Sequence, residues 1–427
     1  FNTTKYIDYS IRKKGKNYLV SNQGTMNSPV EVVFFGKEKK EIKRVWLTHV
    51  EGSQEIKGPE SAYYAVIDPD EFMPDVKREN NSTKSFLRFH WVWDQPTYYD
   101  HDLNFLPWVK YNYYNGLAPG LMLYKGGPGY NGFAAAEPMW DLKNGKPIGK
   151  IYKVHNYEKN DLFHKSSLSF GGMHLHGTRS GNIIFRGSKN KDKAKMNFSL
   201  KLHYNILNET AFDTSFYQSG TFATEELTFG YNKTFDSILN KIGFQTGLTI
   251  GDQFSSGWIE SNSKISINKK TNLSIRSWVG NHFNTKNVPK HYRTYLSGGI
   301  DPNFSRYIFD RTGRSNFQVL QSQYIVEGPA LRGLYKDDIG TTSGVWGLKL
   351  DAKISFLPNL FYDIAGGEDY ETLKAAGIQL GPIIIPLYQS WEKEDSKTAT
   401  NSRWIADRVR LQFGLTFAAG PFGVFSF

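Results

Sequence analysis

The chain has 427 residues, a formal net charge of +11 at pH 7 and no cysteine. Without cysteine it has neither disulfides nor thiolate metal sites. Its basic residues are scattered through mixed-sign segments such as 37–40 and 189–195. This pattern favours solvated turns, or attraction to anionic lipid head groups, over nucleic-acid binding. Aromatic residues make up 15% and glycines number 40, against 22% charged residues, which predicts an all-β fold.

Residues 1–82 carry short β-type runs separated by turns rich in Gly, Asn and Lys. The runs lie at residues 18–20, 30–35, 45–47 and 62–67. This spacing predicts a small N-terminal β-sandwich. The polar stretch 78–83 reads as a linker, so we place the domain boundary between residues 82 and 83. The sequence begins at Phe1 without a signal-peptide pattern, and we expect a processed product whose original N-terminus lies further upstream.

Residues 83–427 show a different pattern, in which apolar and polar residues alternate. The alternation is clearest at Met196–Tyr204, Trp346–Phe356 and Val409–Phe417, and it puts all apolar groups on one face of each strand. A soluble sandwich gives the same alternation, but its strands average about 5 to 6 residues, whereas membrane-crossing strands need about 9 to 11. No apolar run approaches the roughly 18 residues of a membrane helix. The long strands therefore favour a transmembrane barrel, closed because lipid cannot satisfy a free sheet edge.

Sixteen candidate strands are present, and an even number is typical of bacterial single-chain barrels. We expect them near residues 108–124, 146–156, 165–176, 180–187, 195–206, 221–233, 239–251, 256–268, 272–283, 291–300, 316–327, 342–356, 359–366, 371–380, 383–391 and 407–417. The chain ends in alternating aromatic residues, including Phe425 and Phe427. This end resembles the C-terminal signal of outer-membrane barrels.

The segment Glu327-Gly328-Pro329-Ala330-Leu331-Arg332-Gly333-Leu334-Tyr335 resembles the loop motif of the bacterial surface antigen superfamily, the outer-membrane barrels that include BamA and TamA. In that family the loop folds into the lumen and its arginine meets an acidic residue on a nearby strand. The resemblance implies that Arg332 pairs with Asp363. A bidentate Arg–carboxylate pair would fix a long loop inside a watery lumen, and the alternative is an Arg332 on a solvated loop. Leu331 and Leu334 depart from the family's usual valine and aromatic residue.

The first domain has its own resemblance. Asp68-Pro69-Asp70 followed by Arg78-Glu79-Asn80-Asn81 is similar to the end of the β-sandwich that follows the catalytic domain in HExxH zinc aminopeptidases, and Val30–Phe35 fits a strand of it. In that family the sandwich carries no chemistry, so the resemblance implies a supporting domain. The sequence contains no HExxH, the motif that would hold zinc and supply a general base. Any peptidase domain would lie before Phe1.

Other chemical motifs are weak. His174 and His176 share one face of a strand and could bind a metal with a third ligand, but such residues more often line a barrel lumen. Gly126-Gly127-Pro128-Gly129 lacks the following Lys-Ser/Thr of a phosphate loop, so it reads as a turn. We expect no catalytic residue, no metal site and no cofactor in this chain.

We therefore expect an outer-membrane barrel that anchors a peptidase-like module in the periplasm. Its partners would be outer-membrane lipid and proteins of an envelope complex. Two alternatives stay open at this stage. The barrel itself could assemble or export polypeptides, or the intact protein could be a membrane-anchored metallopeptidase with an upstream catalytic domain.

Overall fold

The structure is a computed structural model. It describes residues 5–84, 87–91, 101–112, 116–125, 132–157, 160–208, 217–268, 270–285, 287–298, 321–323, 328–334, 340–355, 357–381, 383–390 and 410–412. In these residues strands dominate, with two short 3-10 turns, η1 (Arg78–Asn80) and η2 (Lys290–Tyr292), which confirms the all-β prediction. No helix among the described residues is long and apolar enough to cross a membrane.

The chain forms two compact units. Residues 1–107 with 121–136 make the first, and residues 108–120 with 137–427 make the second. The first unit contains the small sandwich, and most of the long strands belong to the second. The boundary between residues 82 and 83 stays a prediction.

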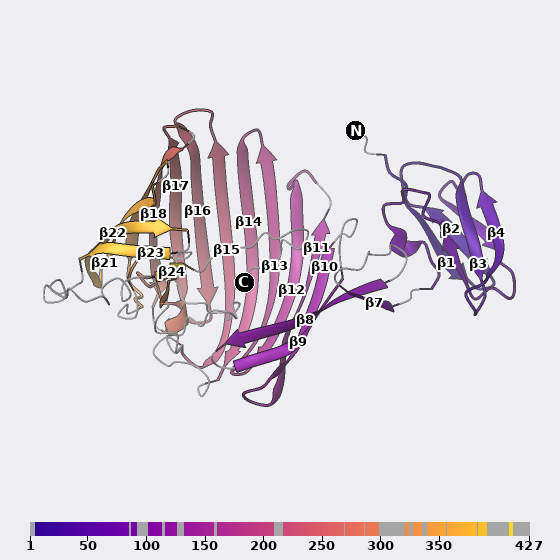
Figure 1. The fold of residues 1–427 in the computed structure, drawn as a ribbon, viewed down its shortest axis with the longest axis horizontal. Helices are drawn as coiled ribbons and strands as arrows, with labels where there is room; N and C mark the ends of the chain where they lie inside the picture. Colours follow the sequence, from indigo (N-terminus) through magenta and orange to yellow (C-terminus); the bar gives the residue numbers. More distant parts are fainter. Residues whose placement is uncertain are drawn as a thin grey trace. The chain divides into compact units, whose positions relative to one another are not determined.

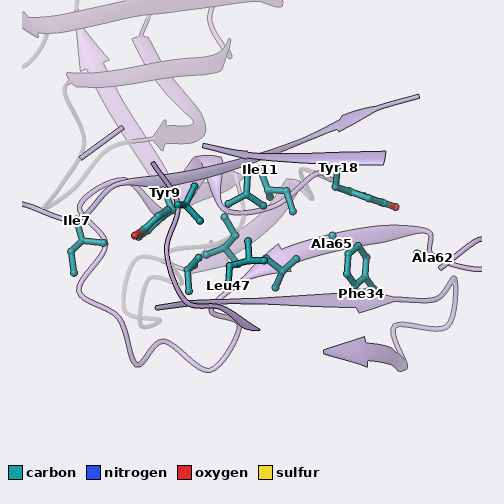
Figure 2. Packing of buried hydrophobic residues seen from close by; sticks show 13 residues of the cluster. Ile7, Tyr9, Ile11, Tyr18, Phe34, Leu47, Ala62 and Ala65 are labelled. Atoms are coloured by element: carbon teal, nitrogen blue, oxygen red, sulfur yellow. The ribbon is translucent and has the colours of Figure 1, made fainter. Parts of the chain in front are cut away.

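The sandwich consists of two antiparallel three-stranded sheets. One has the order β1 (Tyr9–Lys14), β2 (Asn17–Asn22) and β5 (Ser53–Lys57), and the other has the order β4 (Glu41–Leu47), β3 (Val30–Phe35) and β6 (Tyr64–Ile67). The sequence did not predict β1 and β5, because β1 has only two apolar residues, Tyr9 and Ile11, and β5 is largely polar and exposed. Figure 2 shows Ile11 and Tyr18 of the first sheet and Phe34 and Leu47 of the second pointing into the shared core. Burial of these apolar faces holds the two sheets together.

Hydrogen bonds to Asp75 connect the segment after β6 to β1. Its carboxylate accepts hydrogen bonds from the backbone N–H of Tyr9 at 2.8 Å and of Lys77 at 2.8 Å, and from the side-chain amide of Asn81 at 3.3 Å. Burial raises the pKa of Asp75, and these donors oppose that shift. The carboxylate is therefore a structural acceptor inside the sandwich.

Residues 78–83 are also fixed to the sandwich, although the sequence suggests a linker there. Asp68 accepts a hydrogen bond from the N–H of Met73 at 2.7 Å and lies 3.6 Å from the Arg78 guanidinium. Thr83 and Ala65 exchange backbone and side-chain hydrogen bonds. The Asp-Pro-Asp and Arg-x-Asn-Asn residues therefore form one hydrogen-bonded cap over the end of β6.

Asp75→Ala should destabilise the sandwich by roughly 2 to 6 kcal/mol, because it leaves at least two buried donors without an acceptor at about 1 to 3 kcal/mol each. In calorimetry of the full chain, the sandwich transition should fall by at least about 8 °C. Glu55→Ala, which removes the exposed pair with Lys14, is the control and should leave the transition in place. An unchanged transition in Asp75→Ala would show that the cap does not stabilise the domain.

The remaining strands form a closed barrel with the order β10 to β24, then β7, β8 and β9. Their bounds are β7 (Leu87–Trp91), β8 (His101–Asn112), β9 (Gly116–Lys125), β10 (Gly132–Asp141), β11 (Lys146–Tyr157), β12 (Lys165–Leu175), β13 (Thr178–Lys191), β14 (Ala194–Leu207), β15 (Gly220–Thr234), β16 (Leu239–Gly251), β17 (Ser255–Ser266), β18 (Thr271–Asn284), β19 (Gln321–Gln323), β20 (Val345–Ile354), β21 (Asn359–Gly367), β22 (Tyr370–Leu380), β23 (Ile383–Gln389) and β24 (Arg410–Gln412). Figure 1 shows the long strands β11 to β18 side by side. In the described part of the chain, β7 and β19 are short and pair in parallel, with β8 and β24, so the regular sheet has sixteen strands, as predicted.

The membership of the sheet differs from the prediction in three places. The single strand expected at 108–124 is two strands, β8 and β9, and Gly116, the first residue of β9, has a φ of +62°, a conformation that favours glycine and that the expected single strand does not allow for. The alanine-rich strand β10 was missed because alanine has a low β propensity. The strand expected at 291–300 is wrong over the described residues 291–298: η2 lies at its start, and its buried His291 packs against Phe222.

Two further expected strands fall mostly outside the described residues. Of residues 316–327 the structure describes only β19, and of residues 407–417 only β24. The C-terminal Phe425 and Phe427 also lie outside the described residues.

The barrel wall has two chemically different faces. Leu200, Leu227 and Leu248 lie in one cross-strand row on β14, β15 and β16 and are 38%, 41% and 36% exposed. Directly beside them, on the opposite face, Lys201 Nζ lies 3.0 Å from Glu226 Oε1. Because neighbouring residues of a strand point to opposite faces, one face of the wall is apolar and the other carries ion pairs.

Candidate functional site

Residues 328–334 lie against the polar face of the wall. They come between β18 and β20, which pair directly with each other. A Cβ placed on Gly347 of β20 would come within 2.7 Å of the Pro329 ring. The neighbouring Trp346 points to the opposite face and is 40% exposed. The loop therefore occupies the interior of the barrel, and glycine at 347 gives it room.

Arg332 makes a bidentate contact with Asp363 of β21. Its Nε and one terminal nitrogen lie 2.8 and 2.5 Å from the two carboxylate oxygens, and its backbone N–H donates to the same carboxylate at 3.0 Å. Arg332 is 2% exposed and Asp363 is 0% exposed. Two parallel charge-assisted bonds with no water access make this a strongly directional contact.

Three further side chains complete the surroundings of the guanidinium. Asp351 of β20 forms an ion pair with it, and Gln379 of β22 accepts a hydrogen bond at 3.1 Å. The ring of Phe361 lies beneath it, with its centroid 4.2 Å from the guanidinium carbon. The planar guanidinium can use its edges and its face at the same time, which lysine cannot do.

The loop backbone is held by a second set of charges. Arg276 of β18 donates to the carbonyl of Gly328 at 2.8 Å and to that of Pro329 at 3.3 Å. Glu260 of β17 fixes Arg276 at 2.7 Å. Lys349 of β20 donates to the carbonyl of Ala330 at 2.9 Å. Three consecutive carbonyls thus face cations, and the site contains three cations and three carboxylates in all.

The loop backbone adopts left-handed conformations that explain its residue types. Gly328, Ala330 and Gly333 have φ values of +64°, +54° and +91°. At Gly333 a Cβ would also lie 2.3 Å from the Gln389 amide nitrogen, so only glycine fits there. Ala330 is a non-glycine residue in this region, and the bond from Lys349 to its carbonyl helps to hold it there.

Apolar side chains of the loop complete a buried cluster. Leu331 and Leu334 are 1% and 5% exposed and pack with Leu296, Val345 and Phe361. The N–H of Leu331 donates to the carbonyl of Leu296 at 2.7 Å. The two positions that depart from the family pattern therefore remain apolar and buried.

The arms leading into and out of the loop are also fixed. Thr294 and Thr341 form an antiparallel bridge, and hydrogen bonds from Ser343 and Thr341 lower the pKa of Asp369 in the β21–β22 turn. On the first arm, His291 is 3% exposed and packs against Phe222 with ring centroids 4.8 Å apart. Burial lowers the pKa of His291 to about 3, so this arm is held by a neutral imidazole.

The structure thus brings Arg332 and Asp363 into direct contact, while Glu327 and Tyr335 of the same motif lie outside the described residues. His174 is the penultimate residue of β12, which ends at Leu175, and His176 follows in the turn. Among the residues that the structure describes, no group of three or more His, Asp or Glu is placed to hold a metal ion.

Sequence reasoning did not single out the other charged residues of the site. Lys349 and Asp351 are polar positions of an alternating strand. Their place on the inward face of that strand is the only sequence signal that could have indicated them. Arg276 and Glu260 come from strands well before the loop, and their contact depends on the register of β17 and β18.

No protein-family model matches this sequence, and no curated protein matches it either. Among solved structures, the chain is similar to BamA from Haemophilus ducreyi lacking POTRA domains 1–3. The two share 12% sequence identity with a TM-score of 0.39, and the alignment covers 67% of this chain and 66% of that chain.

Arg332→Ala and Asp363→Ala should each destabilise the loop by about 3 to 5 kcal/mol, because each leaves a buried charge without its partner. The double mutant should be little worse than either single mutant, since the two residues act as a pair. The first measurement is electrophoresis after heating to increasing temperatures: a folded barrel migrates faster than a boiled one, and the temperature at which this difference is lost should fall. The second measurement is protease cleavage within the loop, which should increase.

The matched control is Lys201→Ala with Glu226→Ala, an interior pair that is more exposed, at 18% and 28%. It should cost clearly less than the loop pair. Strictly additive effects of Arg332→Ala and Asp363→Ala would mean that the two residues do not stabilise each other.

Proposed function

We propose that this chain is an outer-membrane barrel that anchors a small periplasmic β-sandwich, with its lumen narrowed by the fixed loop at residues 328–334. The observation that carries the proposal is the inverted polarity of the barrel wall. Its apolar side chains face away from the ring and its ion pairs face the lumen.

The exposed apolar residues are too many for a water-soluble surface. Soluble monomers rarely expose continuous apolar patches beyond a few hundred Å². Here such residues recur on neighbouring strands from β12 to β18. They are Phe170 (45%), Ile183 (42%), Leu202 (40%), Phe229 (41%), Ile250 (46%), Ile259 (48%) and Val279 (51%). A closed sheet has no free edge, so lipid can cover this face without leaving backbone groups unsatisfied.

The interior site supports an anchoring role. Its charged groups bind one another and the loop backbone, and the loop fills space next to β20 to β22. Such a lumen is narrowed on one side by a fixed segment. We therefore favour an anchor within an envelope complex over an open diffusion pore.

The sandwich supports the second half of the proposal. The residues that resemble the post-catalytic domain of zinc aminopeptidases, Asp68, Arg78 and Asn81 among them, bind one another and the ends of strands. Their role here is structural, as expected for a supporting domain. We propose that it presents or supports a peptidase-like partner region in the periplasm.

Leu227→Arg should destabilise the barrel by roughly 2 to 4 kcal/mol in lipid, because it places a charge on the apolar face near the middle of a strand. Thr228→Arg, one residue further along β15, points into the lumen and should cost less than about 1 kcal/mol. The measurement is urea unfolding in lipid vesicles. The folded fraction is read from electrophoresis, in which unheated folded barrel migrates differently from boiled barrel.

In a water-soluble protein the order of these two effects would be reversed, since Leu227 would then be an ordinary exposed position. A protein that is monodisperse without detergent, or an equal effect of the two substitutions, would contradict the membrane assignment.

A further inference from the structure

We infer that one end of the sandwich is a docking surface for an anionic lipid bilayer. The inference rests on the proposed membrane location of the barrel. The surface consists of two hairpin tips, residues 13–16 and 37–40, which we call the basic tips. The first reads Lys13-Lys14-Gly15-Lys16 and the second Lys37-Glu38-Lys39-Lys40, so they hold six lysines and one glutamate.

The two basic tips lie at the same end of the domain. Tyr18 follows the first tip and Phe34 precedes the second, and their rings meet edge to face with centroids 5.0 Å apart. Figure 2 shows Tyr18 and Phe34 together at one end and Ile7 at the other. The tip lysines are all exposed. Lys14 forms an ion pair with Glu55 at 3.2 Å, and the charges of the other tip lysines add at a single surface.

The opposite end of the sandwich is acidic. Asp8, Asp68, Asp70 and Asp75 lie there, close to the starts of β1 and β3 and the end of β6. Asp68 forms an ion pair with Arg78 and Asp70 with Arg44, so the excess of negative charge comes from Asp8, Asp75 and the exposed Glu51 and Glu71. A domain with positive charge at one end and negative charge at the other is oriented by an external field. An anionic surface would attract the basic tips and repel the other end.

Apolar groups next to the basic tips favour lipid over an acidic protein. Ile42 is 40% exposed and Tyr63 is 46% exposed. Ile42 lies beside Gly36 at the base of the second tip, and the N–H of Tyr63 donates to the carbonyl of Phe35 at 2.8 Å. Lysines flanking an exposed aliphatic and an exposed tyrosine are typical of surfaces that sit at the head-group boundary.

The covalent connection keeps the sandwich near the membrane. The N–H of Lys84 still donates to the hydroxyl of Ser82 at 3.3 Å, and β7, which pairs with β8 of the barrel, begins at Leu87. The three Cα–Cα steps from Lys84 to Leu87 span at most about 11 Å when fully extended. The basic tips are therefore at high effective concentration next to the bilayer that holds the barrel.

The test uses the full chain in lipid nanodiscs and exploits its lack of cysteine. Glu38→Cys carries an environment-sensitive fluorophore at a basic tip, and Glu51→Cys, in the turn at the acidic end, is the matched control. In nanodiscs with about 30% phosphatidylglycerol, the label at position 38 should shift to the blue, and in pure phosphatidylcholine it should not. The label at position 51 should not respond in either lipid, and roughly 0.5 M NaCl should abolish the response at 38.

Replacing Lys13, Lys14 and Lys16 by glutamate should lower the ratio of docked to undocked sandwich by at least about 100-fold, since each lysine near an anionic surface contributes about fivefold. Equal responses in both lipids, or equal responses at positions 38 and 51, would overturn the inference. A response only to added polyglutamate would assign the surface to an acidic protein instead. Electrophoresis of unheated and boiled portions of the same samples reports separately on whether the barrel is folded. A folded barrel without a fluorescence response would contradict docking alone, whereas the absence of a folded barrel in lipid would contradict the membrane assignment.

Discussion

Charges removed from water must be balanced by opposite charges and hydrogen bonds, and the interior of this barrel depends on that balance. Arg332, Arg276 and Lys349 face Asp363, Asp351 and Glu260 in one connected set. Arg332 belongs to the loop itself, and Arg276 and Lys349 donate hydrogen bonds to the carbonyls of loop residues. Removing any one member leaves an excess charge inside a closed space, so loop position and charge balance are a single property of the site.

The barrel wall obeys a complementary constraint. The outward face can be apolar because the sheet closes on itself and satisfies its own backbone groups. The inward face can be charged because every strand alternates between the two environments. The loop belongs to the second environment, and glycines at 347 and 333 allow its backbone to approach the wall closely. The fold and the site thus follow from the same alternation along the strands.

Much of this organisation can be predicted from the sequence, within identifiable limits. Long alternating runs such as 196–204 predicted their strands well, because burial on one side and solvation or lipid on the other leave a strict period of two. Strands with weak alternation were missed, as at β5 and β10. The expected strand at 291–300 failed because the chain turns into η2 there, with His291 buried against Phe222.

The site also contains residues that could be predicted from the sequence and residues that could not. Arg332 and Asp363 could be named from the sequence through the family resemblance of their motif. The contacts of Arg276, Glu260 and Lys349 could not, because they depend on strand register and on loop carbonyls, which carry no sequence signal. In the sandwich, the residues of the Asp-Pro-Asp segment were noticed for their resemblance, and the structure explains them by their hydrogen bonds. Side chains that act through main-chain atoms are the hardest to predict.

The most direct test of a charge-fixed interior loop is the chemical accessibility of Leu331, which is 1% exposed. Leu331→Cys in lipid vesicles should resist a membrane-impermeant maleimide, whereas Leu162→Cys, at a position 72% exposed, should react at once. Adding Asp363→Ala to Leu331→Cys should accelerate labelling at least about 100-fold, as expected from a loss of about 3 kcal/mol. If Leu331→Cys reacted as fast as Leu162→Cys in the otherwise unchanged protein, the loop would not be held in the interior.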